Sequence, residues 1–189
     1  MTNTVTLIAD HLGSTRPRVQ GTEYVVDAII NVTDFDDAQA GLTADFVAVA
    51  NSMVVTAGTF VASKYTVGQN LILAGTVETF SGVTVASVDA ATALTLSAVA
   101  GDNANDSGVT VSTDQEVIPY STFGLTKVSQ VQILGQENDT LLWNVELGTT
   151  GETSIADHLV LKCNTASSGA QATGDVGTIR VRLVGQIGL

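Results

Sequence analysis

Alternation of side chains with a period of two is the feature that most restricts how this chain can fold. In residues 22–33, TEYVVDAIINVT, every second residue from Tyr24 to Val32 is apolar, while Asp27 and Asn31 fall on the opposite face. The same alternation recurs in residues 127–135, 140–148, 157–164 and 177–188. A period of two with many β-branched residues is typical of half-buried antiparallel strands. We therefore predict an all-β fold built on an antiparallel β-sandwich.

The alternation also assigns individual side chains to faces. In residues 127–135 it groups Ser129 with Val131 and Ile133. In residues 140–148 it places four apolar side chains on one side, namely Leu141, Trp143, Val145 and Leu147. Strand side chains point to opposite faces in turn, so each group is expected to face the core together.

Helical signals are few. Residues 121–125, STFGL, could form a single helical turn with Ser121 as its N-cap. Residues 34–50 carry Phe35, Ala38 and Leu42 at helical spacing, although Gly41 weakens a helix there.

A change of composition divides the chain. Residues 38–113 contain no Arg, Pro, His or Trp and only six charged residues, namely Asp45, Lys64, Glu78, Asp89, Asp102 and Asp106. Insertions are tolerated at exposed turns, where the chain ends lie close together. We therefore predict that residues 38–113 form a small β-barrel or β-sandwich module inserted into the larger sandwich. Residues 1–37 would supply an N-terminal arm and the first strands, and residues 114–189 the remainder.

The predicted module divides into short strands bounded by turn residues, which suggests a small barrel or sandwich. The expected strands are residues 53–58, 58–63, 69–76, 82–90, 93–98 and 108–112, with a tight connection at 89–92. The expected core comprises Phe60, Tyr65, Leu71, Leu73, Phe80, Val83, Val85, Leu94 and Leu96.

The charge and the hydropathy of the sequence indicate which partners the protein can bind. Only 14% of the 189 residues are charged and the mean hydropathy is +0.31, so we expect other subunits to cover part of the surface. The net charge of −12 argues against a nucleic-acid surface, which needs clustered Lys and Arg. The basic pairs are Arg16 with Arg18, and Arg180 with Arg182. The second pair would share one strand face, which we expect to be solvated or ion-paired.

The sequence begins without the basic and apolar segments of a signal peptide, and no apolar run approaches the length of a membrane helix. We expect a protein made in the cytosol, without a cleaved signal, that does not contact a membrane.

Residues 65–112 resemble a recurrent module of tailed-phage virion proteins. The matching phrases are YTVGQNLILAG (65–75), SGVTVASV (81–88), TALTL (92–96) and GVTV (108–111). The module usually has Asp where this chain has Gln69, and an Asn-Gly turn where it has Ser81-Gly82.

The flanking segments resemble small phage capsid-decoration, or cement, proteins. The matching phrases are VIPYSTFGLTKVSQVQI (117–133) and TIRVRLVGQIGL (178–189). The resemblance implies a β-sandwich that assembles as a homotrimer on the outer capsid lattice, with the major capsid protein as partner and the virion as location. The inserted module departs from that compact form, so the position in the virion stays open.

Residues for nucleophilic or zinc chemistry are scarce. The chain has two histidines, His11 and His158, and one cysteine, Cys163. Five residues apart on a strand, His158 and Cys163 would face opposite ways, so a catalytic dyad is not expected. Cys163 is in phase with Leu159 and Leu161 and is expected in the core. We predict no enzymatic activity, no catalytic or metal site and no cofactor.

Two polar stretches are candidates for metal sites. Asp34, Asp36 and Asp37 are interpreted as a turn or a helix start. Residues 101–114 loosely match the spacing of a calcium-binding loop through Asn103, Asn105, Ser107, Gly108 and Asp114. Amides occupy the positions that need charge and a strand follows, so we expect a hairpin loop instead.

Two functions follow from the sequence. In the first, the chain is a non-enzymatic capsid-decoration protein, and residues 1–21, with Arg16, Pro17 and Arg18, form an extended arm that reaches a neighbour. In the alternative, the chain is a tail, fibre or head-fibre component, and module 38–113 binds a host glycan. Sugar sites usually offer aromatic platforms, and the module's aromatic residues are Phe46, Phe60, Tyr65 and Phe80.

Overall fold

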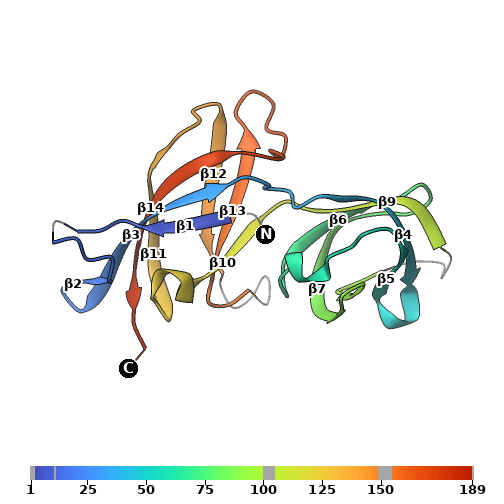
Figure 1. The fold of residues 1–189 in the computed structure, drawn as a ribbon, viewed down its shortest axis with the longest axis horizontal. Helices are drawn as coiled ribbons and strands as arrows, with labels where there is room; N and C mark the ends of the chain where they lie inside the picture. Colours follow the sequence, from blue (N-terminus) through green and yellow to red (C-terminus); the bar gives the residue numbers. More distant parts are fainter. Residues whose placement is uncertain (1–2, 11, 100–104, 149–154, 189) are drawn as a thin grey trace. The chain divides into compact units, whose positions relative to one another are not determined.

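The computed structural model describes residues 3–10, 12–99, 105–148 and 155–188 (Figure 1). Strands and three short 3₁₀ turns account for the regular structure of these residues. The prediction of an all-β fold is therefore confirmed. The chain divides into two compact units, one formed mainly by Asp36–Asp114 and the other by the segments on either side. The first range nearly coincides with the predicted module, 38–113.

The larger unit contains a five-stranded antiparallel sheet. Its strands follow the order β1-β3-β14-β11, and β2 pairs with β3. Their bounds are β1 (Asn3–Leu7), β2 (Arg18–Gln20), β3 (Glu23–Val32), β11 (Lys127–Gln136) and β14 (Gly177–Gln186). The two longest-range partners, β3 and β14, pair along almost their whole length, from Gly177 opposite Val32 to Gly185 opposite Tyr24.

A three-stranded sheet completes this unit. Its order is β10 (Glu116–Pro119), β13 (His158–Thr165), β12 (Leu141–Leu147). One apolar core contains buried residues of both sheets, among them Ile30, Val181, Leu161 and Cys163. Two sheets that share a core in this way form the predicted β-sandwich. At one side of the sandwich Asn3 Nδ2 on β1 donates a hydrogen bond of 2.8 Å to Glu116 Oε2 on β10.

The predicted strand faces agree with the structure except in β11. Val26, Ala28, Ile30 and Val32 all lie in the core, and Leu141 and its three alternating partners are buried there or packed against it. In β11 the buried residue is Val128, whereas Ser129 is exposed. A β-bulge between Val128 and Gln130 changes the phase of the strand, so grouping Ser129 with Val131 and Ile133 was wrong.

The N-terminal segment is part of the sheet. Residues 1–21 were expected to form an extended arm, but β1 pairs with residues 28–32 of β3, and β2 pairs with residues 23–25 of the same strand. These pairings bind β1 and β2 to a strand of the same chain, whereas the expected arm would extend to a neighbouring subunit. Ser121 also differs from expectation, because the 3₁₀ turn η3 (Tyr120–Phe123) begins after Pro119 and has no side-chain N-cap.

The smaller unit is a closed six-stranded barrel. Neighbouring strands follow the order β4-β5-β8-β7-β6-β9, and β9 pairs with β4 to complete the ring. Their bounds are β4 (Gln39–Val47), β5 (Ser52–Ala57), β6 (Asn70–Ala74), β7 (Thr79–Ala90), β8 (Ala93–Leu96) and β9 (Asn105–Thr113). The 3₁₀ turns η1 (Ala48–Ala50) and η2 (Ala62–Lys64) lie in its connections. Within the described residues, closure gives each of these six strands a neighbour on both sides.

The predicted core residues lie in the barrel core, which also includes residues that were not predicted, among them Leu42, Phe46 and Met53. Eight of the nine predicted core residues are buried, and Phe80, the ninth, is partly buried and packs against them. Two secondary-structure assignments were wrong. Residues 58–63 form no strand, and Ala62 and Ser63 are part of η2. The possible helix in residues 34–50 is replaced by strand β4 and the turn η1. Bulges on either side of Leu42 break the alternation of β4, so its sequence resembles a helical pattern.

Candidate interaction surface

Asp27 and Arg182 meet on the outer face of the five-stranded sheet. Alternation turns both side chains away from the core, and the antiparallel register sets the two residues directly opposite each other. Arg182 Nε donates a hydrogen bond of 2.7 Å to Asp27 Oδ1, and Nη2 donates one of 2.9 Å to Oδ2. This two-point geometry is the strongest common pairing of a guanidinium with a carboxylate.

Arg18 adds a second guanidinium to the same carboxylate. It lies on β2, opposite Val25, and its Nη2 donates a 3.1 Å hydrogen bond to Asp27 Oδ2. One arginine from each basic pair, Arg18 and Arg182, is thus bound to Asp27. Arg182 confirms the expectation of an ion-paired strand face, while Arg16 is exposed and lies outside the cluster.

The environment keeps the carboxylate charged. Asp27 is 8% exposed. Hydrogen bonds from Arg182 lower the pKa of its carboxyl, and the charges of Arg182, Arg18 and Arg180 act in the same direction, against the opposing effect of burial. The guanidinium groups remain accessible, because the side chain of Arg182 is 41% exposed and that of Arg18 is 45% exposed. The cluster therefore presents positive groups around a sheltered negative one.

Two shallow hollows flank this cluster. One, of about 270 Å³, is lined by Arg18, Val19, Gln20, Val25 and Arg182. The other, of about 250 Å³, lies on the Arg180 side and includes Ile29 and Gly135 in its lining. Val19 is 68% exposed and Ile29 is 39% exposed. Protein-binding surfaces commonly combine arginine side chains with exposed apolar residues, as this face does.

Charge is distributed unevenly between the two units. Residues 36–114 hold eight acidic residues and one base, Lys64. Four of the seven bases lie in strands of the five-stranded sheet, namely Arg18, Lys127, Arg180 and Arg182. In an acidic chain this sheet is therefore the region suited to contact an acidic partner.

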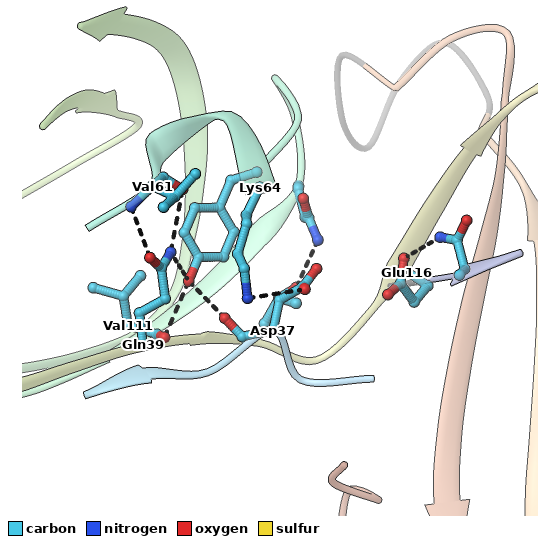
Figure 2. A network of polar contacts seen from close by, with 10 residues as sticks. Asp37, Gln39, Val61, Lys64, Val111 and Glu116 are labelled. Carbon is cyan, nitrogen blue, oxygen red and sulfur yellow. Dashed lines mark hydrogen bonds and ion pairs between the residues drawn. The ribbon is translucent and has the colours of Figure 1, made fainter. Parts of the chain in front are cut away.

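A second polar cluster is internal to the barrel (Figure 2). Gln39 Nε2 donates to the Val61 carbonyl at 3.2 Å, and the Val61 amide donates back to Gln39 Oε1 at 2.7 Å. Asp37 forms an ion pair with Lys64, with 3.6 Å between Oδ1 and Nζ. The Asp37 side chain is fully buried and its backbone is left-handed, with φ of 44°. The predicted turn around Asp34, Asp36 and Asp37 is confirmed, and Asp37 serves to anchor η2.

Asp106 fixes a turn of the barrel. Its carboxylate accepts hydrogen bonds from the Thr76 hydroxyl at 2.5 Å and from the backbone amides of Thr76, Val77 and Glu78 at 3.0 to 3.2 Å. These bonds, with the Thr76 hydroxyl the largest contributor, lower the pKa of Asp106 to about 2. The carboxylate therefore holds the connection between β6 and β7 against β9, and its oxygens are occupied by this structural role.

The residues considered for chemistry do not converge. Cys163 is 1% exposed within the sandwich core, and His158 Nδ1 lies 2.8 Å from the Ala156 carbonyl. His11 and Asn103 lie outside the described residues. Asn105, Ser107 and Gly108 are part of strand β9, where Gly108 adopts φ of 65°. Among the residues that the structure describes, no three His, Cys, Asp or Glu side chains are placed to hold a metal ion.

The aromatic residues of the barrel are internal. Phe46, Phe60 and Tyr65 are at most 7% exposed, and Phe80 packs edge-on against Phe46 with 5.2 Å between ring centroids. The barrel thus presents none of these rings as an open platform. Nor does any helix within the described ranges have the length and apolar character needed to span a membrane.

Comparisons of the chain with models of protein families, with curated proteins and with solved structures find no match.

Proposed function

We propose that this chain is a capsid-decoration protein of a tailed-phage virion, which binds the outer capsid lattice and stabilises it without catalysing a reaction. The observation that carries the proposal is the arginine cluster around Asp27, an ordered and accessible surface suited to protein contact. The resemblance of residues 117–133 and 178–189 to capsid-decoration proteins supports it independently.

The outer face of the five-stranded sheet would contact the lattice. Asp27 holds Arg182 and Arg18 in fixed orientations, so less side-chain entropy is lost when they bind an acidic partner. Val19 and Ile29, both exposed, would be covered in the complex. The major capsid protein is the proposed partner.

We further propose that the protein acts as a homotrimer. Three linked copies would bind the lattice with far higher avidity than one, without any additional type of contact. A low proportion of charged residues, 14%, agrees with a surface that is partly covered by other subunits. The net charge of −12 would keep decorated particles apart.

The test uses particles assembled without this protein. Purified chain is added to tailless capsids and, separately, to isolated tails, and the bound fraction is measured after sedimentation. Capsid decoration predicts retention on the capsids and a higher temperature of capsid disruption. Binding only to tails would support the alternative of a tail or fibre component. A well-dispersed monomer that binds neither particle would overturn both.

Glycan adhesion receives less support than decoration. The alternative relied on aromatic residues of the barrel as a stacking platform, and Phe46, Phe60 and Tyr65 are buried. Sugar binding there would need a different surface, so capsid decoration is the function that we propose.

A further inference from the structure

A groove lies on the barrel unit. It has a volume of about 360 Å³ and lies between residues 60–63, which include the start of η2, and residues 88–91 at the end of β7. Its lining includes Phe60, Val61 and Ser63 on one side and Val88 and Asp89 on the other. All of these residues belong to the barrel unit, so the groove is a feature of that unit alone.

The walls of the groove are held by hydrogen bonds. The Ala62 amide donates to the Ala91 carbonyl at 3.2 Å, which ties one wall to the other. Gln39 holds the backbone of Val61 at both its amide and its carbonyl, as Figure 2 shows. These contacts fix the groove before any ligand arrives, and a preformed site loses less free energy to ordering on binding.

Asp89 supplies the charge at the rim. Its Oδ1 accepts a 2.6 Å hydrogen bond from the Ser87 hydroxyl, and its Oδ2 accepts one of 2.7 Å from Thr95. Each carboxylate oxygen can accept two hydrogen bonds, so each retains capacity for a ligand. The residue is exposed, and within the described part of the chain no base forms an ion pair with it.

The remainder of the groove is apolar. Val61 is 43% exposed and Val88 is 39% exposed, while Phe60 is 7% exposed. The lining also includes the small side chains of Ala90 and Ala91. An occupant would thus meet both aliphatic surface and an oriented carboxylate.

We propose that this groove binds a lysine or arginine side chain presented by a partner protein. Such a side chain has an aliphatic stem to cover the valines and a cationic head for Asp89. The field of the barrel favours the same ligand, because the barrel has eight acidic residues and its one base, Lys64, is paired with the buried Asp37. A metal ion is a poorer fit, because Asp89 is the only carboxylate among the described residues that line the groove.

The experiment uses the whole chain and three neutral-backbone probes of similar size. N-acetyl-arginine methylamide and N-acetyl-lysine methylamide are cationic, whereas N-acetyl-citrulline methylamide is a neutral analogue of the first. Each probe is titrated while backbone amide signals are followed by NMR. We expect both cationic probes to shift the signals of Val61, Ser63 and Ala91, and citrulline to bind about two- to fivefold more weakly than arginine.

Two variants test the role of the carboxylate. Asp89→Asn is expected to weaken the binding of both cationic probes by about the same two- to fivefold factor. The binding of the citrulline probe should not change. Asp139→Asn makes the same change in net charge on an exposed residue of the sandwich unit and is expected to leave all three titrations as they are.

Several results would overturn this proposal. These are equal binding of arginine and citrulline, shifts confined to residues outside the groove, or equal weakening by Asp139→Asn. Unchanged amide spectra of the variants without probe establish that they are folded. The capsid-decoration proposal rests on a different surface and is not affected by these outcomes.

Discussion

Arg182 and Asp27 lie 155 positions apart in the chain, yet they face each other across two neighbouring strands and share two hydrogen bonds. The pair joins the last strand of the sandwich to one of its first strands. Its contribution can be measured because Arg180, two residues away on the same strand face, is exposed and lies opposite Ile29 instead of an acid.

Replacing Arg182 with Ala is expected to lower the free energy of unfolding of the sandwich by about 1 kcal/mol. Hydrogen bonds to a charged group contribute about 1.5–3 kcal/mol when buried, and the exposure of the arginine reduces that value. The single tryptophan, Trp143, packs against the sandwich core, so its fluorescence during urea unfolding reports on this unit. Arg180→Ala is the matched control and is expected to change stability by less than about 0.5 kcal/mol. Equal losses in the two variants would show that the Asp27 pair contributes nothing specific.

Acid should destabilise the barrel through Asp106. A carboxyl whose pKa is lowered by folding, here from 3.8 to about 2, stabilises the folded state fully above its unfolded pKa. That contribution is lost as the pH falls from about 4 towards 2. We therefore expect the NMR signals of Thr76, Val77 and Glu78 to change in this window before the barrel unfolds.

The variant Asp106→Asn isolates the effect of the carboxylate. It removes the ionisable group, so the stability of the barrel should be lower at neutral pH and should vary less between about pH 4 and pH 2. An unchanged pH profile in this variant would assign the acid sensitivity to other carboxyls.

Gly75 is a position where no side chain fits. A Cβ at this residue would overlap the Asp106 carboxylate and lie 3.1 Å from the Glu78 carbonyl oxygen. Gly75→Ala is therefore expected to destabilise the barrel by about 2 kcal/mol, since the hydrogen bonds of Asp106 would have to shift. Gly135 provides the control, because a Cβ there has no neighbouring atom within 4 Å. Chemical unfolding followed by circular dichroism measures the stability of both variants. If Gly75→Ala loses as little stability as Gly135→Ala, the expected overlap is contradicted.

Cys163 is expected to be unreactive in the folded protein. It is 1% exposed, and burial raises the pKa of its thiol to about 11, so little reactive thiolate is present near neutral pH. A thiol reagent should label it only at the rate at which the sandwich opens, and at once in denaturant. Rapid labelling of the native protein would show that the strand β13 opens locally.

Much of the fold could be predicted because β-strands carry a simple sequence signal. Alternation assigned the core faces of β3, β12 and β14 correctly, since each residue step in a strand reverses the side chain. A small barrel or sandwich module was predicted from a change in composition and from its short strands, and the structure shows that it is a closed barrel. Eight of its core residues were identified because large apolar side chains in short strands favour burial together.

The errors fall where the regular period is interrupted. Bulges in β4 and β11 shift the phase of the strand, and such shifts depend on pairing with a distant strand. The cluster around Asp27 could not be predicted either. Asp27 was a visible exception in an apolar strand, but its partners Arg18 and Arg182 come from strands whose register no local pattern determines. The Asp106 contacts with residues 76–78 depend on the same long-range register.

Arg180 offers a test of the proposed capsid contact that leaves folding intact. It is exposed and lines one of the two hollows of the outer sheet face. Within the described residues, the ion pairs of Asp27 are made by Arg18 and Arg182, and Arg180 makes none with it. We expect Arg180→Gln to reduce retention on capsids by about two- to fivefold, and the reduction to shrink as salt is raised. Lys162→Gln removes one positive charge from the three-stranded sheet, where Lys162 pairs with Glu146 at 3.3 Å. If both variants are retained equally well, the outer face of the five-stranded sheet is not the surface that meets the lattice.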